Sequence, residues 1–309
     1  MSNFSVKKLK NVSVTNNAVI INKGRIVKDS CVREECHKKY HGLKFRLKYF
    51  FPIFSNNKKS YILTTDEWSK NYCHFLWEAL SKLIDLKKSA PDATLVLQKS
   101  YLKIDFMVKA LEAFGYRSEN VKVIPKRSHL RVKNLSFIPC INIATAGYYD
   151  YLKFSEISQT LISYYQEKLK TNYGERIYIS RSDPKKNTAR KIANEDELVK
   201  MLAKQGFKTV YMENFSFLEQ ISIMNFARYI VAPHGAGITN VMFAKKDSFL
   251  FELVNKRWEK TCFAEMCEHM AINYLRFDCE EIDNGENMEL RDIKIKTSQL
   301  EEKLTKILR

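Results

Sequence analysis

The feature that most restricts the fold of this 309-residue chain is a regular alternation of strand and helix patterns in its second half. Short runs rich in β-branched and aromatic residues alternate there with stretches whose apolar residues recur at helical spacing. The expected strands are 176–180, 208–212, 229–232, 249–254 and 273–277, and the expected helices include 195–205, 216–227 and 258–271. Strands that alternate with helices at this spacing pair in parallel, so we expect a parallel α/β sheet.

Several of these helices are preceded by residues that favour a helix start. Asn194 is placed to cap the helix at 195–205, and Ser216 with Glu219 has the spacing of a capping box. Ser298 and Glu301 have the same spacing near the C-terminus, where they predict the start of a closing helix with an apolar stripe.

The first half is less regular but also alternates. Its expected strands are 18–22, 60–65, 94–98, 120–125 and 134–139, with a basic, polar stretch at 127–133, and its expected helices are 70–88, 101–115 and 151–169. A chain of this length suits two domains of about 150 residues each. We therefore expect two Rossmann-like α/β lobes with parallel sheets, residues 1–170 and 171–309, joined near Lys170 to Gly174.

Composition limits the classes of partner and compartment. With 45% hydrophobic residues the chain can bury real cores, and a formal net charge of +17 favours polyanionic partners or an anionic membrane face. Seven cysteines without a C-x-x-C pair suggest neither a zinc site nor a disulfide framework. Since the first residues lack the apolar segment of a signal peptide, we expect a cytoplasmic protein, peripheral at most to the inner membrane face.

A glycine-rich turn follows the expected strand 229–232. His234 is followed by Gly235, Ala236 and Gly237, although the chain has only nine glycines. Ligands of open parallel sheets bind at the carboxyl ends of the strands, and a helix start there offers unpaired amides to a phosphate. The turn is therefore a candidate anion cradle, although glycines in an isolated G-x-G often serve only a tight turn, with the histidine bonded to backbone.

A second basic element favours the cradle. Arg181 comes directly after the strand 176–180, at the same edge of the sheet, and Arg190 follows in the same loop. A guanidinium at this position can pair with a phosphate through two hydrogen bonds. Lys185 and Lys186 of this loop are interpreted as solvated.

Three segments resemble glycosyltransferase family 61. They are 176-RIYISRSDPKKNTARKIANEDEL-198 and 230-IVAPHGAGITNVMFAKKDSFLFEL-253, similar to the family's C-terminal half, and 71-NYCHFLWEAL-80, similar to a helix of its first half. The resemblance implies an inverting enzyme of the two-lobed GT-B type, with a nucleotide-sugar donor on the second lobe and a glycan or lipid-linked glycan acceptor entering between the lobes. Family members include bacterial capsule and lipopolysaccharide transferases and eukaryotic xylosyl- and N-acetylglucosaminyltransferases, so we expect a role in bacterial surface-polysaccharide synthesis.

The resemblance also implies which residues bind the donor. They are Arg181, Arg190, His234, Gly235, Ala236, Gly237, Asn240 and Glu252. Basic groups would stabilise the departing nucleoside diphosphate, and no D-x-D pair stands at a strand end, so neither a metal ion nor another cofactor is expected. Glu252 could bind a ribose or serve as a buried structural carboxylate, and both interpretations stay open.

Inverting transfer needs a base for the acceptor hydroxyl, and the first-half helix supplies candidates. His74 and Glu78 are spaced i, i+4 and share one helix face, and His234 is a rival base. In a purely structural interpretation, His74 is a satisfied histidine and Glu78 pairs with Lys82. Trp77 and Trp68 could stack on a sugar, but a packed aromatic on an amphipathic helix is commoner.

Two other classes of function remain open. The net charge of +17 fits a nucleic-acid-binding protein, but no zinc finger or other named module occurs and the basic residues are spread along the chain, so no nucleic acid is expected. A sugar-nucleotide-binding module without catalysis predicts donor binding with no turnover.

Overall fold

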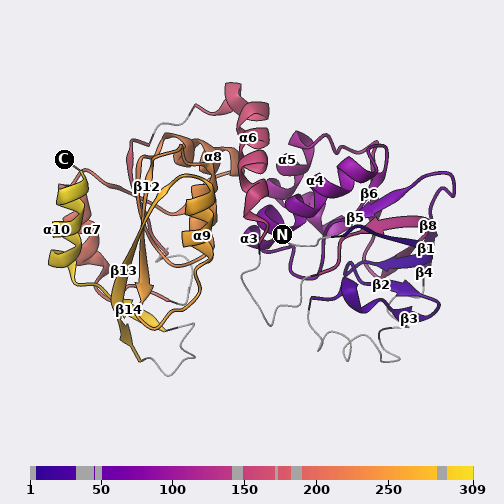
Figure 1. Cartoon of the computed structure of the whole chain (residues 1–309), viewed down its shortest axis with the longest axis horizontal. Coiled ribbons are helices and arrows are strands. Elements are labelled where there is room, and N and C mark those ends of the chain that lie inside the picture. The colour runs from indigo at the N-terminus through magenta and orange to yellow at the C-terminus, as the bar shows by residue number, and fades with distance from the viewer. Residues whose placement is uncertain are drawn as a thin grey trace. The chain divides into compact units, whose positions relative to one another are not determined.

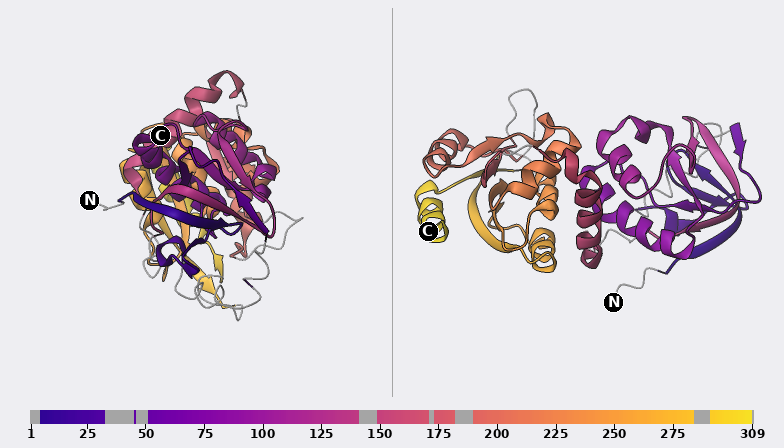
Figure 2. Two further views of the ribbon diagram at one scale, coloured as in Figure 1. Left: turned by 90° about the vertical axis from the view of Figure 1, so that its right-hand side faces the viewer. Right: turned by 90° about the horizontal axis from the view of Figure 1, so that it is seen from above.

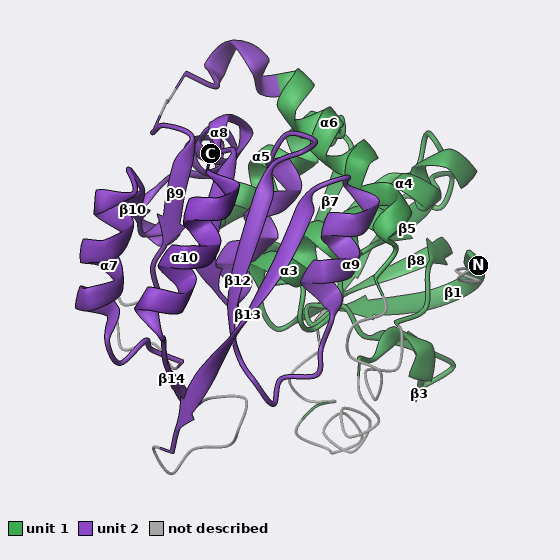
Figure 3. Cartoon of the chain, turned by 60° about the vertical axis from the view of Figure 1, so that its left-hand side comes forward, with its two compact units in different colours: residues 1–164 green, residues 165–309 purple. Residues whose placement is uncertain are grey.

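The computed structural model describes residues 5–32, 45, 51–140, 149–170, 173–181, 190–283 and 291–308. The chain divides into two compact units, residues 1–164 and 165–309, coloured separately in Figure 3. Both units are mixed α/β structures that contain parallel strands, which confirms the expected class. In the described ranges, no helix is long and apolar enough to cross a membrane.

Unit 1 is built on an eight-stranded mixed sheet of order β3-β2-β1-β8-β5-β6-β7, with β4 also paired to β8. Its strands are β1 (Lys7–Thr15), β2 (Ile20–Asn22), β3 (Arg25–Ile26), β4 (Phe51–Phe54), β5 (Tyr61–Leu63), β6 (Thr94–Gln98), β7 (Val121–Ile124) and β8 (Ser128–Phe137). Strands β4 to β8 pair in parallel, whereas β1, β2 and β3 are antiparallel. The prediction of a wholly parallel sheet was therefore wrong for this unit, because tight turns join β1 to β2 and β2 to β3, and such turns connect only antiparallel strands.

The helices of unit 1 gather on one side of this sheet (Figures 1 and 2). They are α3 (Tyr72–His74), a π-helical turn (Phe75–Ala79), α4 (Leu80–Ser89), α5 (Asp105–Ala113) and α6 (Phe154–Tyr165), which ends at the boundary with unit 2. The first three form one continuous helical stretch, as the pattern at 70–88 predicted, and Lys87 Nζ ties α4 to α5 by donating to the Phe114 carbonyl over 2.7 Å.

Unit 2 contains a six-stranded sheet of order β10-β9-β11-β12-β13-β14. Its strands are β9 (Arg176–Ile179), β10 (Lys208–Val210), β11 (Tyr229–Pro233), β12 (Phe249–Asn255), β13 (Asn273–Ile282) and β14 (Asp292–Lys294). The five strands β9 to β13 are parallel, which confirms the prediction from the alternating pattern. The edge strand β14 is antiparallel to β13 and was not predicted.

Helices cover both faces of this sheet (Figures 1 and 2). They are α7 (Glu195–Lys204) and α10 (Thr297–Ile307) on one face, and α8 (Phe217–Phe226) and α9 (Cys262–His269) on the other. The first pair encloses a core with Leu198, Leu300 and Leu304 against Val231 and Phe251 of the sheet.

The predicted helix caps differ in outcome. Ser216 and Glu219 form the expected capping box at the start of α8. Asn194 precedes α7, but its side chain binds both the amide and the carbonyl of Ile295 instead of an amide of the first turn. The capping box at Ser298 was wrong, because α10 begins at Thr297 and Ser298 already lies inside the helix.

The strand order of unit 2 creates a point where ligands of such sheets bind. The chain leaves β9 toward the outer strand β10 and returns past β9 to β11, so β9 and β11 are neighbours whose connections run in opposite directions. Open α/β sheets bind their ligands outside the carboxyl ends of strands at this position. Arg181 follows β9 and His234 follows β11, so both predicted residues lie at that edge.

Candidate active site

Arg181 and the glycine-rich turn are fitted to each other. The Arg181 guanidinium donates from Nη1 to the His234 carbonyl over 2.6 Å. A Cβ atom added to Gly235 would lie 1.9 Å from Arg181 Nη1, and one added to Gly237 would lie 3.1 Å from Ile179 Cγ2. Gly235 therefore makes room for the arginine, so the turn holds a positive charge at the ligand-binding edge of the sheet.

His234 belongs to a hydrogen-bonded chain of three side chains. Its Nδ1 lies 2.5 Å from Glu252 Oε1, and the Tyr274 hydroxyl donates to Glu252 Oε2 over 2.6 Å. The Glu252 side chain is only 4% exposed, against 13% for His234. Glu252 therefore uses both of its oxygens inside the protein, as the partner of a histidine.

The register of the sheet brings these three residues together. Glu252 pairs with Ala232, two residues before His234, and Tyr274 of β13 pairs with Leu250, two residues before Glu252. Side chains two apart in a strand share a face, so all three residues point away from the core under α7 and α10. On this side, the ring centroid of Phe263 in α9 lies 5.1 Å from that of His234, and that of Trp258 lies 4.4 Å away.

The electrostatics of this edge disfavour additional positive charge. Burial lowers the pKa of His234; the bond and charge of Glu252 oppose this, but with the repulsion of Arg190 and Arg181 the pKa ends below its usual range. Burial and the neighbouring Arg190 lower the pKa of Arg181 to about 10. Both shifts mean that an anion bound here would relieve a repulsion that already exists.

A shallow pocket that opens to solvent lies beside His234. The lining residues are Arg190, Pro233, His234, Leu253, Val254, Asn255, Trp258, Arg291 and Ile293. Arg190 lies over the Trp258 ring, with its guanidinium carbon 5.9 Å from the ring centroid. The pocket thus joins basic groups to an aromatic and apolar wall.

The remaining predicted donor-binding residues lie within the turn or just after it. Ala236 and Gly237 begin a 3-10 helix, Ala236–Phe243, where we had expected an ordinary helix. Asn240 is buried, and its amide donates to Gln220 Oε1 over 3.1 Å and to the Gly237 carbonyl over 3.3 Å. Asn240 therefore braces the turn against α8. Lys185 and Lys186 lie outside the described residues.

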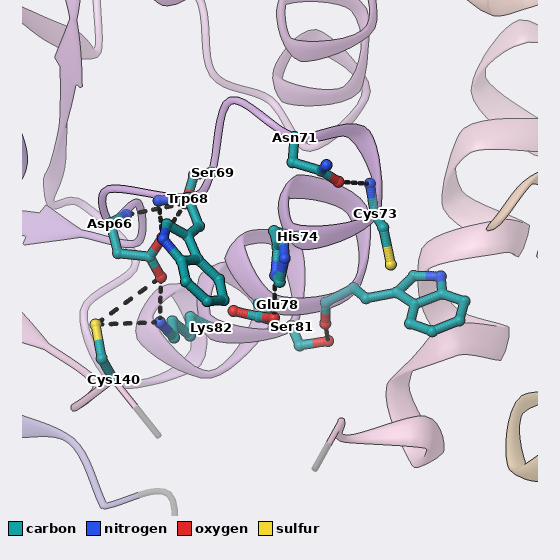
Figure 4. Close-up of polar contacts among 11 residues, drawn as sticks. Asp66, Trp68, Ser69, Asn71, Cys73, His74, Glu78, Ser81, Lys82 and Cys140 are labelled. Carbon is teal, nitrogen blue, oxygen red and sulfur yellow. Dashed lines mark hydrogen bonds and ion pairs between the residues drawn. The ribbon is translucent and has the colours of Figure 1, made fainter. Parts of the chain in front are cut away.

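Unit 1 contains the other predicted pair, drawn in Figure 4. His74 Nδ1 lies 2.5 Å from Glu78 Oε1, and the two side chains are 21% and 19% exposed. The π-helical turn Phe75–Ala79 lies between α3 and α4 and contains Glu78. Such turns occur often at functional sites. Burial lowers the pKa of His74, but the bond to Glu78 and the charges of Glu78 and Asp66 outweigh it, so the pKa is raised.

The structural alternative had predicted that Glu78 pairs with Lys82, but Lys82 hydrogen-bonds to Asp66 instead. Its ammonium donates to Asp66 Oδ2 over 3.2 Å, and both side chains are almost fully buried. Ser69 Oγ and the Trp68 amide donate to Asp66 Oδ1 over 2.9 and 3.0 Å (Figure 4). The buried Asp66–Lys82 ion pair therefore anchors the loop before α3, and Glu78 is left to His74.

The aromatic residues near His74 have different roles. Trp77 is 0% exposed and packs on Tyr149 and Phe154, with ring centroids 4.8 and 4.9 Å away, which confirms the interpretation of Trp77 as a packed aromatic and not a sugar-stacking one. The Trp68 and His74 rings pack in an edge-to-face arrangement, with their centroids 5.1 Å apart.

Comparison with known sequences identifies the family. The sequence model described as Glycosyltransferase 61 matches residues 72–250, which is more than half of the chain. The chain belongs to glycosyltransferase family 61. It is therefore a member of an enzyme family of sugar transferases. The matched region includes His74 and Glu78 of unit 1 and the glycine-rich turn 234–237 of unit 2.

Curated relatives share a shorter segment. The EGF domain-specific O-linked N-acetylglucosamine transferase of Xenopus laevis is 31% identical over 94 residues, which cover 29% of this chain and 18% of that protein. The Mus musculus protein of the same name is 31% identical over 91 residues, 28% of this chain and 17% of its own length. This family 61 chain thus matches less than a fifth of the length of these relatives.

Among solved structures, rubredoxin oxygen:oxidoreductase from Desulfovibrio gigas aligns over 98% of the chain with 10% identity and a TM-score of 0.27, which is too low to indicate a common fold. Within the described ranges, no group of three or more His, Cys, Asp or Glu side chains could hold a metal ion.

Sequence reasoning missed Tyr274, Trp258 and Asp66. Tyr274 and Trp258 stand in segments expected to be a strand and a helix, with no local motif to mark them. Tyr274 could have been found from the alternation of side chains along a strand, because it shares a sheet face with Glu252 once β12 and β13 are aligned. Asp66 offers no comparable signal, since its contact with Lys82 depends on how the loop before α3 folds.

Proposed function

We propose that this chain is an inverting glycosyltransferase of the two-lobed GT-B type that moves a sugar from a nucleotide-sugar donor to a glycan acceptor. One observation carries the proposal: Arg181 is held across Gly235 where β9 and β11 end, at the point of a parallel sheet where ligands bind. The family membership fixes the class of reaction, and this geometry supports where the donor diphosphate binds.

Unit 2 would bind the donor. Arg181 and Arg190 repel each other and lie beside the pocket that His234 lines. A diphosphate would neutralise both charges, and the same charges would stabilise the leaving nucleoside diphosphate as its sugar bond breaks. No metal ion or cofactor is needed for this step. Residues 171–309 would form the donor lobe.

Unit 1 would activate the acceptor within a lobe of residues 1–170. Although burial opposes it, the hydrogen bond and charge of Glu78 and the charge of Asp66 raise the pKa of His74, which makes it a stronger proton acceptor. Glu78 accepts the Nδ1 proton of His74, so Nε2 is left to take the proton of the acceptor hydroxyl. His74 is therefore the proposed base and Glu78 its partner.

The acceptor and the cellular setting are inferred from the charge of the chain and from its relatives. A net charge of +17 supports an anionic or lipid-linked glycan acceptor at an anionic membrane face. The relatives are named N-acetylglucosamine transferases, which makes that sugar the first donor to test. A cytoplasmic role in bacterial surface-polysaccharide synthesis stays a prediction from the family resemblance.

A thermal-shift panel tests the donor site. The full chain is melted alone and with UDP, GDP, CMP and their sugar conjugates, including the N-acetylglucosamine conjugate of UDP. A ligand that binds the native state raises the melting temperature. At one hundred times its Kd, it adds about 2.7 kcal/mol to the free energy of unfolding. We expect one nucleotide to act selectively and Arg181→Ala to lose the effect. Uniformly flat curves, or an equal rise in Arg181→Ala, would contradict the proposal.

A further inference from the structure

We propose that Glu252 and Tyr274 hold His234 as the imidazole protonated on Nδ1, so that its Nε2 accepts a hydrogen bond from a hydroxyl group of the nucleotide sugar. The inference rests on the proposed function, since it names the ligand group read at the same site. Tyr274 is assigned as a positioning residue, which acts on His234 through Glu252.

The first step follows from the chemistry of the three groups. An ionised carboxylate only accepts hydrogen bonds, so the 2.5 Å contact with Glu252 Oε1 requires a proton on His234 Nδ1. The Tyr274 hydroxyl donates to Oε2 over 2.6 Å, which fixes the carboxylate in turn. A neutral histidine with its proton on Nδ1 carries a lone pair on Nε2. That nitrogen can accept a hydrogen bond but cannot donate one to a phosphate oxygen.

The second step is that the ring is held in one orientation. The Trp258 and Phe263 rings lie against it, with centroids 4.4 and 5.1 Å away. A flipped ring would turn a carbon toward Glu252 and leave a buried carboxylate oxygen without its donor, which is costly. His234 is one of the residues that line the pocket, so a ligand in the pocket would lie beside it.

The third step concerns charge. Burial, and then the charges of Arg190 and Arg181, oppose a second proton on the ring, whereas Glu252 favours one. Tyr274 and the thiols of Cys262 and Cys267 in α9 also surround Glu252, and all three are neutral because their pKa values are raised. The arginines therefore meet the phosphates, and the neutral histidine meets a hydroxyl. A site built to bond a hydroxyl rejects analogues that lack it.

Nitrogen NMR of the full chain, labelled in its six histidines, tests the tautomer without any ligand. His234→Gln identifies the signal of His234. At neutral pH we expect a protonated Nδ1 and a bare Nε2. The opposite tautomer, or a doubly protonated ring at pH 7, would overturn the inference.

Two matched variants test the role of Tyr274. Tyr274→Phe removes the donor to Oε2, leaves more negative charge facing Nδ1, and is expected to shift the titration of His234 upward. Tyr229→Phe makes the same change on β11, which β12 separates from β13; its ring stacks on Phe249, and the variant should leave the titration of His234 unchanged. Equal titrations in Tyr274→Phe and wild type would refute the positioning role.

Deoxy analogues identify the hydroxyl. The nucleotide sugar that the thermal-shift panel selects is compared with its 2′-deoxyribose form and with forms that lack one sugar hydroxyl. We expect one analogue to bind wild type about 10- to 100-fold more weakly than the parent, and this difference to vanish in His234→Ala. A ribose or a sugar hydroxyl is thereby distinguished. Equal binding of all analogues, or a loss that persists in His234→Ala, would overturn the inference. If no nucleotide binds at all, the proposed function fails while the NMR result still stands.

Discussion

The His74–Glu78 pair of unit 1 and the His234–Glu252 pair of unit 2 share one contact, an Nδ1–Oε1 distance of 2.5 Å, and differ in everything around it. The pKa of His74 is raised and that of His234 is lowered. The Glu78 side chain is 19% exposed, against 4% for Glu252. The same hydrogen bond therefore does not determine how readily a histidine takes a proton.

The difference comes from burial and from the next charges outward. Asp66 adds a negative charge near His74, while Arg181 and Arg190 add positive charge near His234. A histidine with a raised pKa is suited to receive a proton from an acceptor hydroxyl, and one with a lowered pKa stays neutral beside the cations that bind a phosphate. The two pairs thus suit the two parts of one transfer reaction.

The largest expected effect comes from Glu78→Gln. The amide cannot hold the positive charge that His74 gains as base, so the rate of transfer should fall about 100- to 10,000-fold. Donor affinity should stay within about twofold, because the variant leaves unit 2 intact. The rate is measured as release of nucleoside diphosphate in the presence of acceptor. A Glu78→Gln protein with full activity would remove the base from this account.

Lys82→Met tests the charges behind His74. It breaks the buried ion pair with Asp66 and leaves a carboxylate uncompensated, which costs about 3–5 kcal/mol of the free energy of unfolding. Lys88→Met on the same helix is the control, because the 66%-exposed Lys88 side chain pairs only at the surface with Glu156. Denaturant melts of both variants provide the measurement, and equal stabilities would contradict the role of the pair.

Arg181→Ala should separate donor binding from the acceptor side. Hydrogen bonds to charged groups contribute about 1.5–3 kcal/mol, so the Kd for the nucleoside diphosphate should rise about 10- to 150-fold. Arg228→Ala removes the same charge from an exposed side chain just before β11, at the opposite end of that strand, and should bind normally. Calorimetric titration of both variants is the test. If both lost the same affinity for the diphosphate, the loss would come from the net charge of the protein and not from the position of Arg181.

Much of unit 2 could be predicted from the sequence, because each parallel strand is a short apolar run between helices. Strand β1 was missed because Lys7, Lys8 and Lys10 mask its apolar residues. Residues 128–133 of the basic stretch proved to be part of β8, in which buried Leu130 and Val132 alternate with exposed Arg131 and Lys133. There the period of two was present, and charge obscured it.

The candidate site was predictable in its members but not in its bonds. The motifs named His234 and Glu252 separately, but they lie eighteen residues apart and meet only through the register of β11 and β12. His74 and Glu78 are one helical turn apart, so their contact followed from spacing alone. Contacts within an element can be predicted from sequence, whereas contacts across a sheet need the register.

Gly235→Ala is expected to reproduce part of the Arg181 effect. The new Cβ would lie 1.9 Å from Nη1, so the guanidinium must move and the Kd for the diphosphate should rise about tenfold. Gly237→Ala is the milder neighbour, since its Cβ would meet a side-chain methyl at 3.1 Å. Fluorescence titration with the diphosphate ranks the two. Should Gly235→Ala bind as wild type does, the fit between arginine and turn would be unimportant.

Transfer and donor binding should depend on pH with different midpoints, because the pKa of His74 is raised and that of His234 is lowered. Transfer needs neutral His74, so its rate should rise with pH through a midpoint above 6.5, the usual histidine pKa. Donor binding needs neutral His234, so affinity should be constant near neutral pH and weaken as pH falls through a midpoint below 6.5. Separate profiles of kcat and of donor Kd check both directions. Coinciding midpoints would mean that one group controls both.

Calorimetric titration of two matched variants with the selected nucleotide sugar tests the division of labour most directly. Glu78→Gln and Glu252→Gln make the same change to the partner of a histidine, one in each unit. The account predicts that Glu78→Gln binds the donor as wild type does and that Glu252→Gln binds it at least tenfold more weakly, because His234 loses its fixed tautomer. Normal donor binding by Glu252→Gln, with impaired binding by Glu78→Gln, would contradict it.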